Sequence, residues 1–210
     1  MTAYLLRLSR DHLGPAARTA LPAAARVLYF LDGALTADGH DVTVDSAWHG
    51  RAPCALVAGP VGATVLRYEL VKKDVRTPGT PLLAHDIVLD RAGAYLMRCD
   101  RVDFDLGAEA LPHRHKGGGI RCLVQGTLEL RVEGQPDRVI GAGEAWFESG
   151  REAVYARASS TVPTSFIRCA ILPRELRGRS SIVYVDPKDA ASTPRRYTVY
   201  VDEPIELPDD

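Results

Sequence analysis

The amino-acid sequence predicts an all-β protein: two tandem copies of an antiparallel barrel or sandwich, followed by a tail that carries further strands. Short runs of β-branched and aromatic residues are separated by Gly, Pro and Asp turns at close spacing, which is the pattern of such folds. A stretch near the N-terminus returns in the second half of the chain, and helical periodicity is weak. The 210 residues suffice for one large domain or two small ones, each with its own core.

The internal repeat starts at residues 3–10, AYLLRLSR, which return at residues 94–101 as AYLMRCDR. Five of the eight positions are identical, at an offset of 91. Two extra residues in the second copy then raise the offset to 93, and the later landmarks keep their order. The matching pairs include Gly33 and Gly126, Leu35 and Leu128, Trp48 and Trp146, and Arg67 and Arg168. Because Arg67 and Arg168 recur in both copies, we expect each to form a structural ion pair.

The first copy is predicted to form a small barrel over residues 1–72. The segment that follows, residues 73–93, contains Pro78 and Pro81 and lacks a long apolar pattern. We therefore predict a linker there, with a short strand near residues 87–89.

The second copy is predicted to form a barrel over residues 94–175. Its expected strands are short apolar or alternating runs, at residues 95–104, 120–124, 127–132, 145–147, 154–158 and 165–172. The tail over residues 176–210 carries two more strand-like runs, 181–185 and 197–201. We expect it to add strands to a sheet edge, either of its own barrel or of a partner in a homodimer.

Composition and charge argue against several classes of protein. Lys and Arg number 26 and Asp and Glu 27, so the net charge of −1 lacks the basic footprint of nucleic-acid binding proteins. No apolar run approaches the roughly 20 residues of a membrane helix, and the N-terminus lacks the features of a signal peptide. We therefore expect a cytoplasmic protein with no nucleic-acid or membrane partner. The cysteines lack Cys-x-x-Cys spacing and are expected to be buried free thiols: Cys54, Cys99, Cys122 and Cys169.

Two histidines in the second copy have the spacing of metal ligands. His113 and His115 are two positions apart, so on a strand both imidazoles project from one face and can offer nitrogens to one metal ion. Two ligands alone bind a metal weakly, so other groups or water must complete the shell. The alternative is that both histidines are solvated loop residues beside Arg114 and Lys116.

The residues around this pair resemble the first motif of the cupin superfamily. They read Gly107-x5-His113-x-His115-x3-Gly119-x6-Gly126, with Gly119 where the motif has Glu. The run from 143 to 150 resembles the second motif, with Glu148 where Pro is expected and Ala153 where a third His would follow.

The first copy resembles the same pattern without its ligands, since Ala20 and Pro22 occupy the positions of the two histidines. The resemblance covers residues 3–72 and 94–172. It implies a bicupin, with two tandem jelly-roll β-barrels of which only the second retains a candidate metal site. It also implies a divalent transition metal, Fe, Mn, Zn, Ni or Cu, bound by the two histidines.

Three more residues of the second copy are candidates for the site. Glu148 is expected to be a third ligand or a catalytic acid or base; otherwise it is a surface carboxylate paired with Arg151. Arg121 lies two residues after Gly119 in an apolar strand, so alternation turns it into the barrel, where its partner is a substrate anion or an internal Glu. If position 153 faces inward, Tyr155 shares its face and is expected to contact the substrate.

These residues support two functions. The first is a metal-dependent enzyme of dioxygenase, isomerase or lyase type acting on a small anionic or carbonyl-containing molecule, with the metal as Lewis acid or oxygen-binding centre. The second is a non-catalytic barrel that binds a small ligand or serves as an assembly module. The correctly spaced His pair favours the first function, and the missing Glu and third His favour the second.

Overall fold

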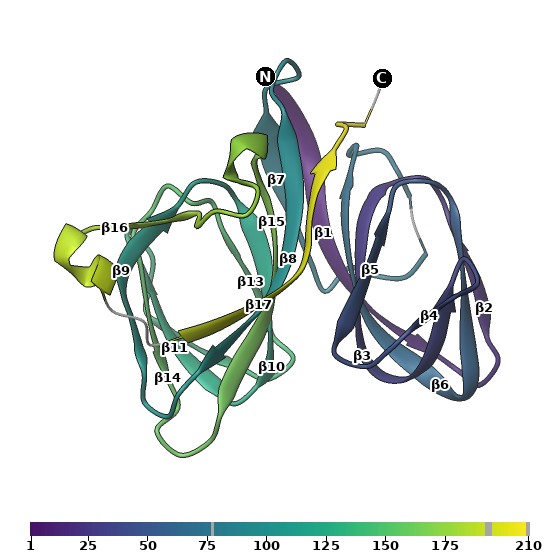
Figure 1. Cartoon of the computed structure of the whole chain (residues 1–210), viewed down its shortest axis with the longest axis horizontal. Coiled ribbons are helices and arrows are strands. Elements are labelled where there is room, and N and C mark those ends of the chain that lie inside the picture. The colour runs from purple at the N-terminus through teal and green to yellow at the C-terminus, as the bar shows by residue number, and fades with distance from the viewer. Residues whose placement is uncertain (77, 192–194, 209–210) are drawn as a thin grey trace. The chain divides into compact units, whose positions relative to one another are not determined.

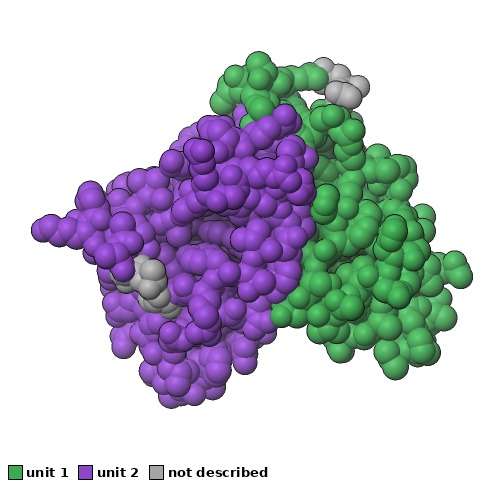
Figure 2. Space-filling view, viewed as in Figure 1, with its two compact units in different colours: residues 1–94, 205–210 green, residues 95–204 purple. Residues whose placement is uncertain are grey.

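The computed structural model describes residues 1–76, 78–191 and 195–208, and Figure 1 shows their arrangement. These residues form antiparallel strands almost throughout, interrupted by two short 3-10 helices. The all-β class predicted from the sequence is therefore confirmed. The chain divides into two compact units, coloured separately in Figure 2: unit 1 comprises residues 1–94 and the residues from 205 onward, and unit 2 comprises residues 95–204.

Unit 1 contains a single sheet with an apolar core. Its strands are β1 (Thr2–Leu13), β2 (Arg18–Leu21), β3 (Ala25–Ala37), β4 (His40–Val42), β5 (Ser46–Gly50), β6 (Cys54–Val71) and β7 (Leu83–Leu89). The order along the sheet is β4-β3-β6-β1-β7, with β2 paired to β6 and β5 to β3. Leu28, Phe30, Leu56 and Val65 are buried in the core, and each side chain of this kind contributes about 1.5–3 kcal/mol on burial.

The segment predicted as a linker contributes a full strand to unit 1. β7 pairs antiparallel with β1, with Thr2 opposite Leu89 and Leu8 opposite Leu83. Residues 73–76 and 78–93 lie within unit 1, and β7 includes the short strand predicted near residues 87–89.

Unit 2 consists of two five-stranded sheets, ordered β13-β10-β15-β8-β17 and β12-β11-β14-β9-β16. The strands are β8 (Tyr95–Phe104), β9 (Glu109–His115), β10 (Gly119–Gln125), β11 (Thr127–Val132), β12 (Arg138–Gly141), β13 (Ala145–Glu148), β14 (Val154–Ala158), β15 (Thr164–Pro173), β16 (Ile182–Tyr184) and β17 (Arg195–Ile205). The 3-10 helices η1 (Arg174–Leu176) and η2 (Pro187–Ala191) flank β16 in the sequence.

The pattern of β11 shows why these segments form strands around a core. Leu128, Leu130 and Val132 are buried, while the polar residues between them are exposed. This period-2 alternation directs one face of the strand to the interior, where the three side chains pack with residues of both sheets, including Trp146 and Phe166.

The tail joins the sheets of unit 2 itself. β16 pairs with β9, with Ile182 opposite His115 and Tyr184 opposite His113. β17 lies at the edge of the other sheet, next to β8. The tail therefore extends its own unit, and a homodimer formed through it stays a prediction.

The strand register agrees with the internal repeat. In unit 1, Leu28 on β3 lies between Trp48 on β5 and Arg67 on β6. In unit 2, the same cross-strand row consists of Arg121 on β10, Trp146 on β13 and Arg168 on β15, a match at each sequence-aligned position. Both repeated arginines form ion pairs, Arg67 with Asp11 and Glu69, and Arg168 with Asp100.

All four cysteines are buried free thiols, as predicted. Among the described residues, no helix is long and apolar enough to span a membrane.

Candidate functional site

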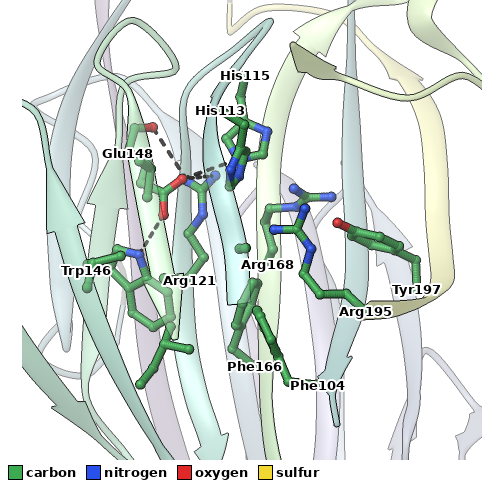
Figure 3. Close-up of a pocket in the computed structure, with 15 residues that line it drawn as sticks. Phe104, His113, His115, Arg121, Trp146, Glu148, Phe166, Arg168, Arg195 and Tyr197 are labelled. Carbon is green, nitrogen blue, oxygen red and sulfur yellow. Dashed lines mark hydrogen bonds and ion pairs between the residues drawn. The ribbon is translucent and has the colours of Figure 1, made fainter. Parts of the chain in front are cut away.

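The candidate site is a small enclosed cavity inside unit 2, drawn in Figure 3. Its volume is about 20 Å³, room for one or two water-sized groups. Polar side chains reach it from β9, β10, β13, β15 and β17. They are His113, His115, Arg121, Glu148, Arg168, Arg195 and Tyr197, with Phe104, Trp146 and Phe166 among the apolar lining residues.

The two histidines predicted as ligands both line this cavity. β9 pairs with β14 on one side and β16 on the other, and its pleat sends His113 and His115 to one face. Their ring centroids lie 4.9 Å apart with the planes at 89°. Nδ1 of His113 donates a hydrogen bond to the Leu111 carbonyl at 2.7 Å, so its Nε2 carries the lone pair.

Both imidazoles are neutral at pH 7. Burial and the nearby Arg195 lower the pKa of His113 to about 4. Burial also lowers the pKa of His115 to about 3, although the Glu148 carboxylate opposes the shift. Neutral imidazole is the form that binds metal ions.

Glu148 is the buried carboxylate of the site. Its Oε2 lies 2.7 Å from Nη2 of Arg121 and 3.3 Å from Nε2 of His115, and its Oε1 accepts a 2.8 Å hydrogen bond from the Trp146 indole. Burial alone would raise the pKa of Glu148, but the Arg121 charge and the His115 and Trp146 hydrogen bonds hold it well below its ordinary value.

Glu148 reaches the cavity from the strand position that faces Gly119. Glu148 lies directly opposite Gly119 in the pairing of β13 with β10. A side chain at 119 has no room, because its Cβ would come within 2.6 Å of the Cys169 carbonyl oxygen and 2.9 Å of the Ala170 Cβ. The carboxylate therefore enters from the neighbouring strand.

Arg121 is buried and faces inward, as alternation predicted, and its exposed fraction is 1%. Its expected partner was a substrate anion or an internal Glu, and in the structure Arg121 forms an ion pair with Glu148. Arg121 also donates a 2.6 Å hydrogen bond to the Gly119 carbonyl. Its guanidinium thus places a fixed positive charge in the cavity wall.

Tyr155 does not line the cavity, and the inward orientation expected for it is corrected. On β14 the neighbours Val154 and Ala156 face the interior instead. The expectation depended on position 153 facing inward, but β14 alternates regularly and pairs with β11 without a register shift, so that positions 154, 156 and 158 face inward instead. The Tyr155 ring lies 5.2 Å from the Arg131 guanidinium, on the outside of the sheet.

Sequence reasoning missed the contribution of β17. Arg195 and Tyr197 are two positions apart on this strand and both reach the cavity. The run was predicted as a strand, but its neighbours were not known, so no signal in the sequence assigned these side chains to the site.

The donor types in the cavity are those that divalent transition metals bind, but they do not converge on one point, because His115 directs Nε2 at Glu148 and its free Nδ1 lies on the other edge of the ring. Nε2 of His113 is an available acceptor, Nδ1 of His115 is buried without a hydrogen-bond partner, and Glu148 supplies an anionic oxygen. Two imidazoles and one carboxylate make a common ligand set for such ions. In the described part of the chain, no three His, Cys, Asp or Glu side chains are arranged around a common point. Arg121 and Trp146 hold the carboxylate in a hydrogen-bonded network.

No family model and no curated protein matches the sequence. Among solved structures, the chain is similar to the oxalate decarboxylase formate complex of Lactobacillus farciminis, with a TM-score of 0.68 and 13% identity over 90% of this chain and 82% of that chain. A deletion mutant of Bacillus subtilis oxalate decarboxylase matches with a TM-score of 0.67 and 13% identity, over 90% of this chain and 73% of that chain. A cupin 2 conserved barrel domain protein from Leptotrichia buccalis matches with a TM-score of 0.50 and 12% identity, over 79% of this chain and 83% of that chain. The fold is therefore bicupin-like.

Proposed function

We propose that unit 2, as a cupin-type barrel, is a metal-dependent enzyme that acts on a small anionic or carbonyl-containing molecule in this cavity. The chemistry belongs to the dioxygenase, isomerase or lyase type. His113, His115 and Glu148 hold a divalent transition metal (Fe, Mn, Zn, Ni or Cu), which supplies Lewis-acid or oxygen-binding chemistry when bound.

The observation that carries this proposal is the contrast between the interiors of the two repeats. Unit 2 brings two neutral imidazoles and an anionic carboxylate to one buried cavity. At the aligned positions unit 1 has Ala20, Pro22 and, opposite Arg26, Gly50. Unit 1 also buries charge, in the ion pairs of Glu69, so the distinguishing feature of unit 2 is the pair of buried neutral imidazoles beside a carboxylate.

Each polar residue of the cavity has a role in this proposal. Glu148 is kept anionic by Arg121 and Trp146, and this is the form required of a ligand or a general base. Arg121 holds Glu148 in place through their 2.7 Å ion pair, so its charge is balanced by that carboxylate. Trp146 and Phe166, whose ring centroids are 5.3 Å apart, form an apolar wall that excludes water.

A second candidate function is a non-catalytic barrel that binds a small ligand. One observation favours it: both oxygens of Glu148 already accept hydrogen bonds from protein donors. In that case Arg121 neutralises the carboxylate permanently, and the cavity binds a small molecule without a metal.

The metal content of untagged protein tests the two functions. We expect the wild type to contain close to one equivalent of a transition metal by elemental analysis, and the His113→Ala/His115→Ala double variant to contain almost none, because each imidazole supplies a ligand bond.

The matched control is His40→Ala/His49→Ala, which removes two exposed histidines of unit 1. Its metal content should equal that of the wild type, and circular dichroism should show that all three proteins are folded. If the His113/His115 variant contains as much metal as the wild type, the metal-dependent function is wrong. If none of the proteins contains metal but the wild type binds a small ligand, the second function holds.

A further inference from the structure

We propose that Arg195, on the C-terminal strand β17, is the anion-binding residue of the cavity and that it recognises the carboxylate of a small organic acid. The inference rests on one part of the proposed function, namely that this cavity is where the ligand binds. It does not depend on a metal being present.

The charges of the cavity point to Arg195. The guanidinium of Arg121 is paired with Glu148 at 2.7 Å, and that of Arg168 with Asp100 at 2.5 Å. Arg195 also lines the cavity, but within residues 1–76, 78–191 and 195–208 it has no ion-pair partner. Three guanidinium groups therefore line the cavity, two of them are balanced by Glu148 in the cavity and by Asp100 behind it, and the charge of Arg195 is left for a ligand.

The contacts of Arg195 hold its guanidinium in place without neutralising it. Its Nη2 donates a 3.2 Å hydrogen bond to the Tyr184 hydroxyl, and the guanidinium lies 5.9 Å from the Phe104 ring and 5.8 Å from the Tyr197 ring. Aromatic rings attract a cation through their π faces but provide no hydrogen-bond acceptor for its N–H groups.

One donor of Arg195 is left unsatisfied. Its Nε is buried and has no hydrogen-bond partner in the structure. Buried donors are almost always paired, so this N–H of a cavity-lining residue is a donor that a ligand or a water molecule can satisfy. Figure 3 shows the Arg195 guanidinium on the side of the cavity opposite Glu148.

The geometry of the cavity limits the ligand to a small carboxylate. A guanidinium presents parallel N–H donors that match the two oxygens of a carboxylate. The inner cavity of about 20 Å³ takes little more than that group. A second cavity of about 290 Å³ has Arg168 and Tyr197 among its lining residues too.

The test compares malonate with its neutral analogue malonamide by isothermal titration at constant ionic strength. Pyruvate and acetate serve as further carboxylate probes. We expect malonate to bind the wild type and malonamide not to bind. Arg195→Gln, which keeps an amide donor but removes the charge, should weaken malonate binding by about 10- to 100-fold, the usual effect of losing charge-assisted hydrogen bonds. Arg195→Lys should recover part of the affinity.

Arg131→Gln is the matched control, because Arg131 also lies over a tyrosine ring but on the outside of the same unit. It should bind malonate as the wild type does. The titrations are carried out on protein as purified and after removal of metal by a chelator, and metal content is measured for each variant.

The outcomes separate this proposal from the proposed function. Equal malonate affinity in the wild type and Arg195→Gln overturns the role of Arg195, as does a wild type that binds none of the three carboxylates. Binding that depends on Arg195 in protein without metal supports the role of Arg195, even if the metal-dependent function fails. If the His113/His115 variant loses its metal but Arg195→Gln binds malonate as the wild type does, the metal-dependent function is supported and the role of Arg195 is wrong.

Discussion

At the scale of single residues, the site shows which contacts a sequence can predict. The shared face of His113 and His115 follows from their spacing on a strand, so the pair could be placed in advance. The contact of Glu148 with His115 depends on the register of β13 against β10, which spacing does not encode. For the same reason Arg195, from a distant strand, could not be assigned.

The two buried histidines predict a loss of stability in mild acid for protein freed of metal. The unfolded chain binds a proton at each histidine with a pKa near 6.5, whereas the folded protein binds it only near pH 4 at His113 and pH 3 at His115. Between about pH 6.5 and 4 the unfolded state binds more protons. The free energy of unfolding therefore falls as the pH falls, by up to about 1.4 kcal/mol per pH unit for each histidine.

Urea unfolding at pH 7, 6 and 5 measures this slope. The His113→Gln/His115→Gln variant should have a flatter dependence over that range. The lowered pKa of Glu148 contributes only below its ordinary value of 4.5, outside this window, because its stabilising charge is lost as the pH falls through the folded pKa. An identical slope in the wild type and the variant would show that these histidines are not responsible.

At the scale of the strands, the face that each strand buries and the packing of its neighbours decide which side chains enter the cavity. The sequence predicted most strands of unit 2, because alternation and turn residues are local signals. It did not predict the orientation of Tyr155, since alternation alone does not say which of the two faces of β14 is buried. Nor did it predict the crowding at Gly119, which arises from the approach of β15.

This crowding predicts that the missing motif carboxylate cannot be restored at position 119. Gly119→Glu should destabilise the protein and should not increase its metal content, because the new side chain meets the backbone of β15. Gly119→Ala should already cost about 1–3 kcal/mol, the usual cost of overpacking.

Thermal and urea unfolding of both variants measure the effect. Gly14→Ala is the control: a Cβ there meets nothing within 4 Å, so its change should stay within about 0.5 kcal/mol. Full stability of Gly119→Glu with increased metal content would contradict the packing argument.

At the scale of the whole molecule, the repeats share a fold but differ in where charge is buried. The duplication could be predicted because matching residues keep their order. The ion pairs of unit 1 could be predicted only in outline, since Arg67 was expected to be paired but Glu69 was not identified. Glu69 is fully buried and accepts bonds from Arg7, Arg26 and Arg67 at 3.0, 2.7 and 2.5 Å.

Glu69 is therefore predicted to be the most sensitive charged residue of unit 1. Glu69→Gln leaves three buried guanidinium groups without their shared carboxylate and should destabilise the protein by about 3–5 kcal/mol in urea unfolding. Glu206→Gln removes an exposed carboxylate paired with Arg51 and should cost at most about 1 kcal/mol. Equal effects of the two substitutions would contradict this prediction.

The position of β17 has a consequence for how the cavity comes into being during synthesis. Every other strand of unit 2 precedes β17 in the chain, so their residues are synthesised before Arg195 and Tyr197. A nascent polypeptide that stops short of β17 has the histidines but not this wall. A chain truncated before β17 would therefore lack the residue proposed to bind the ligand.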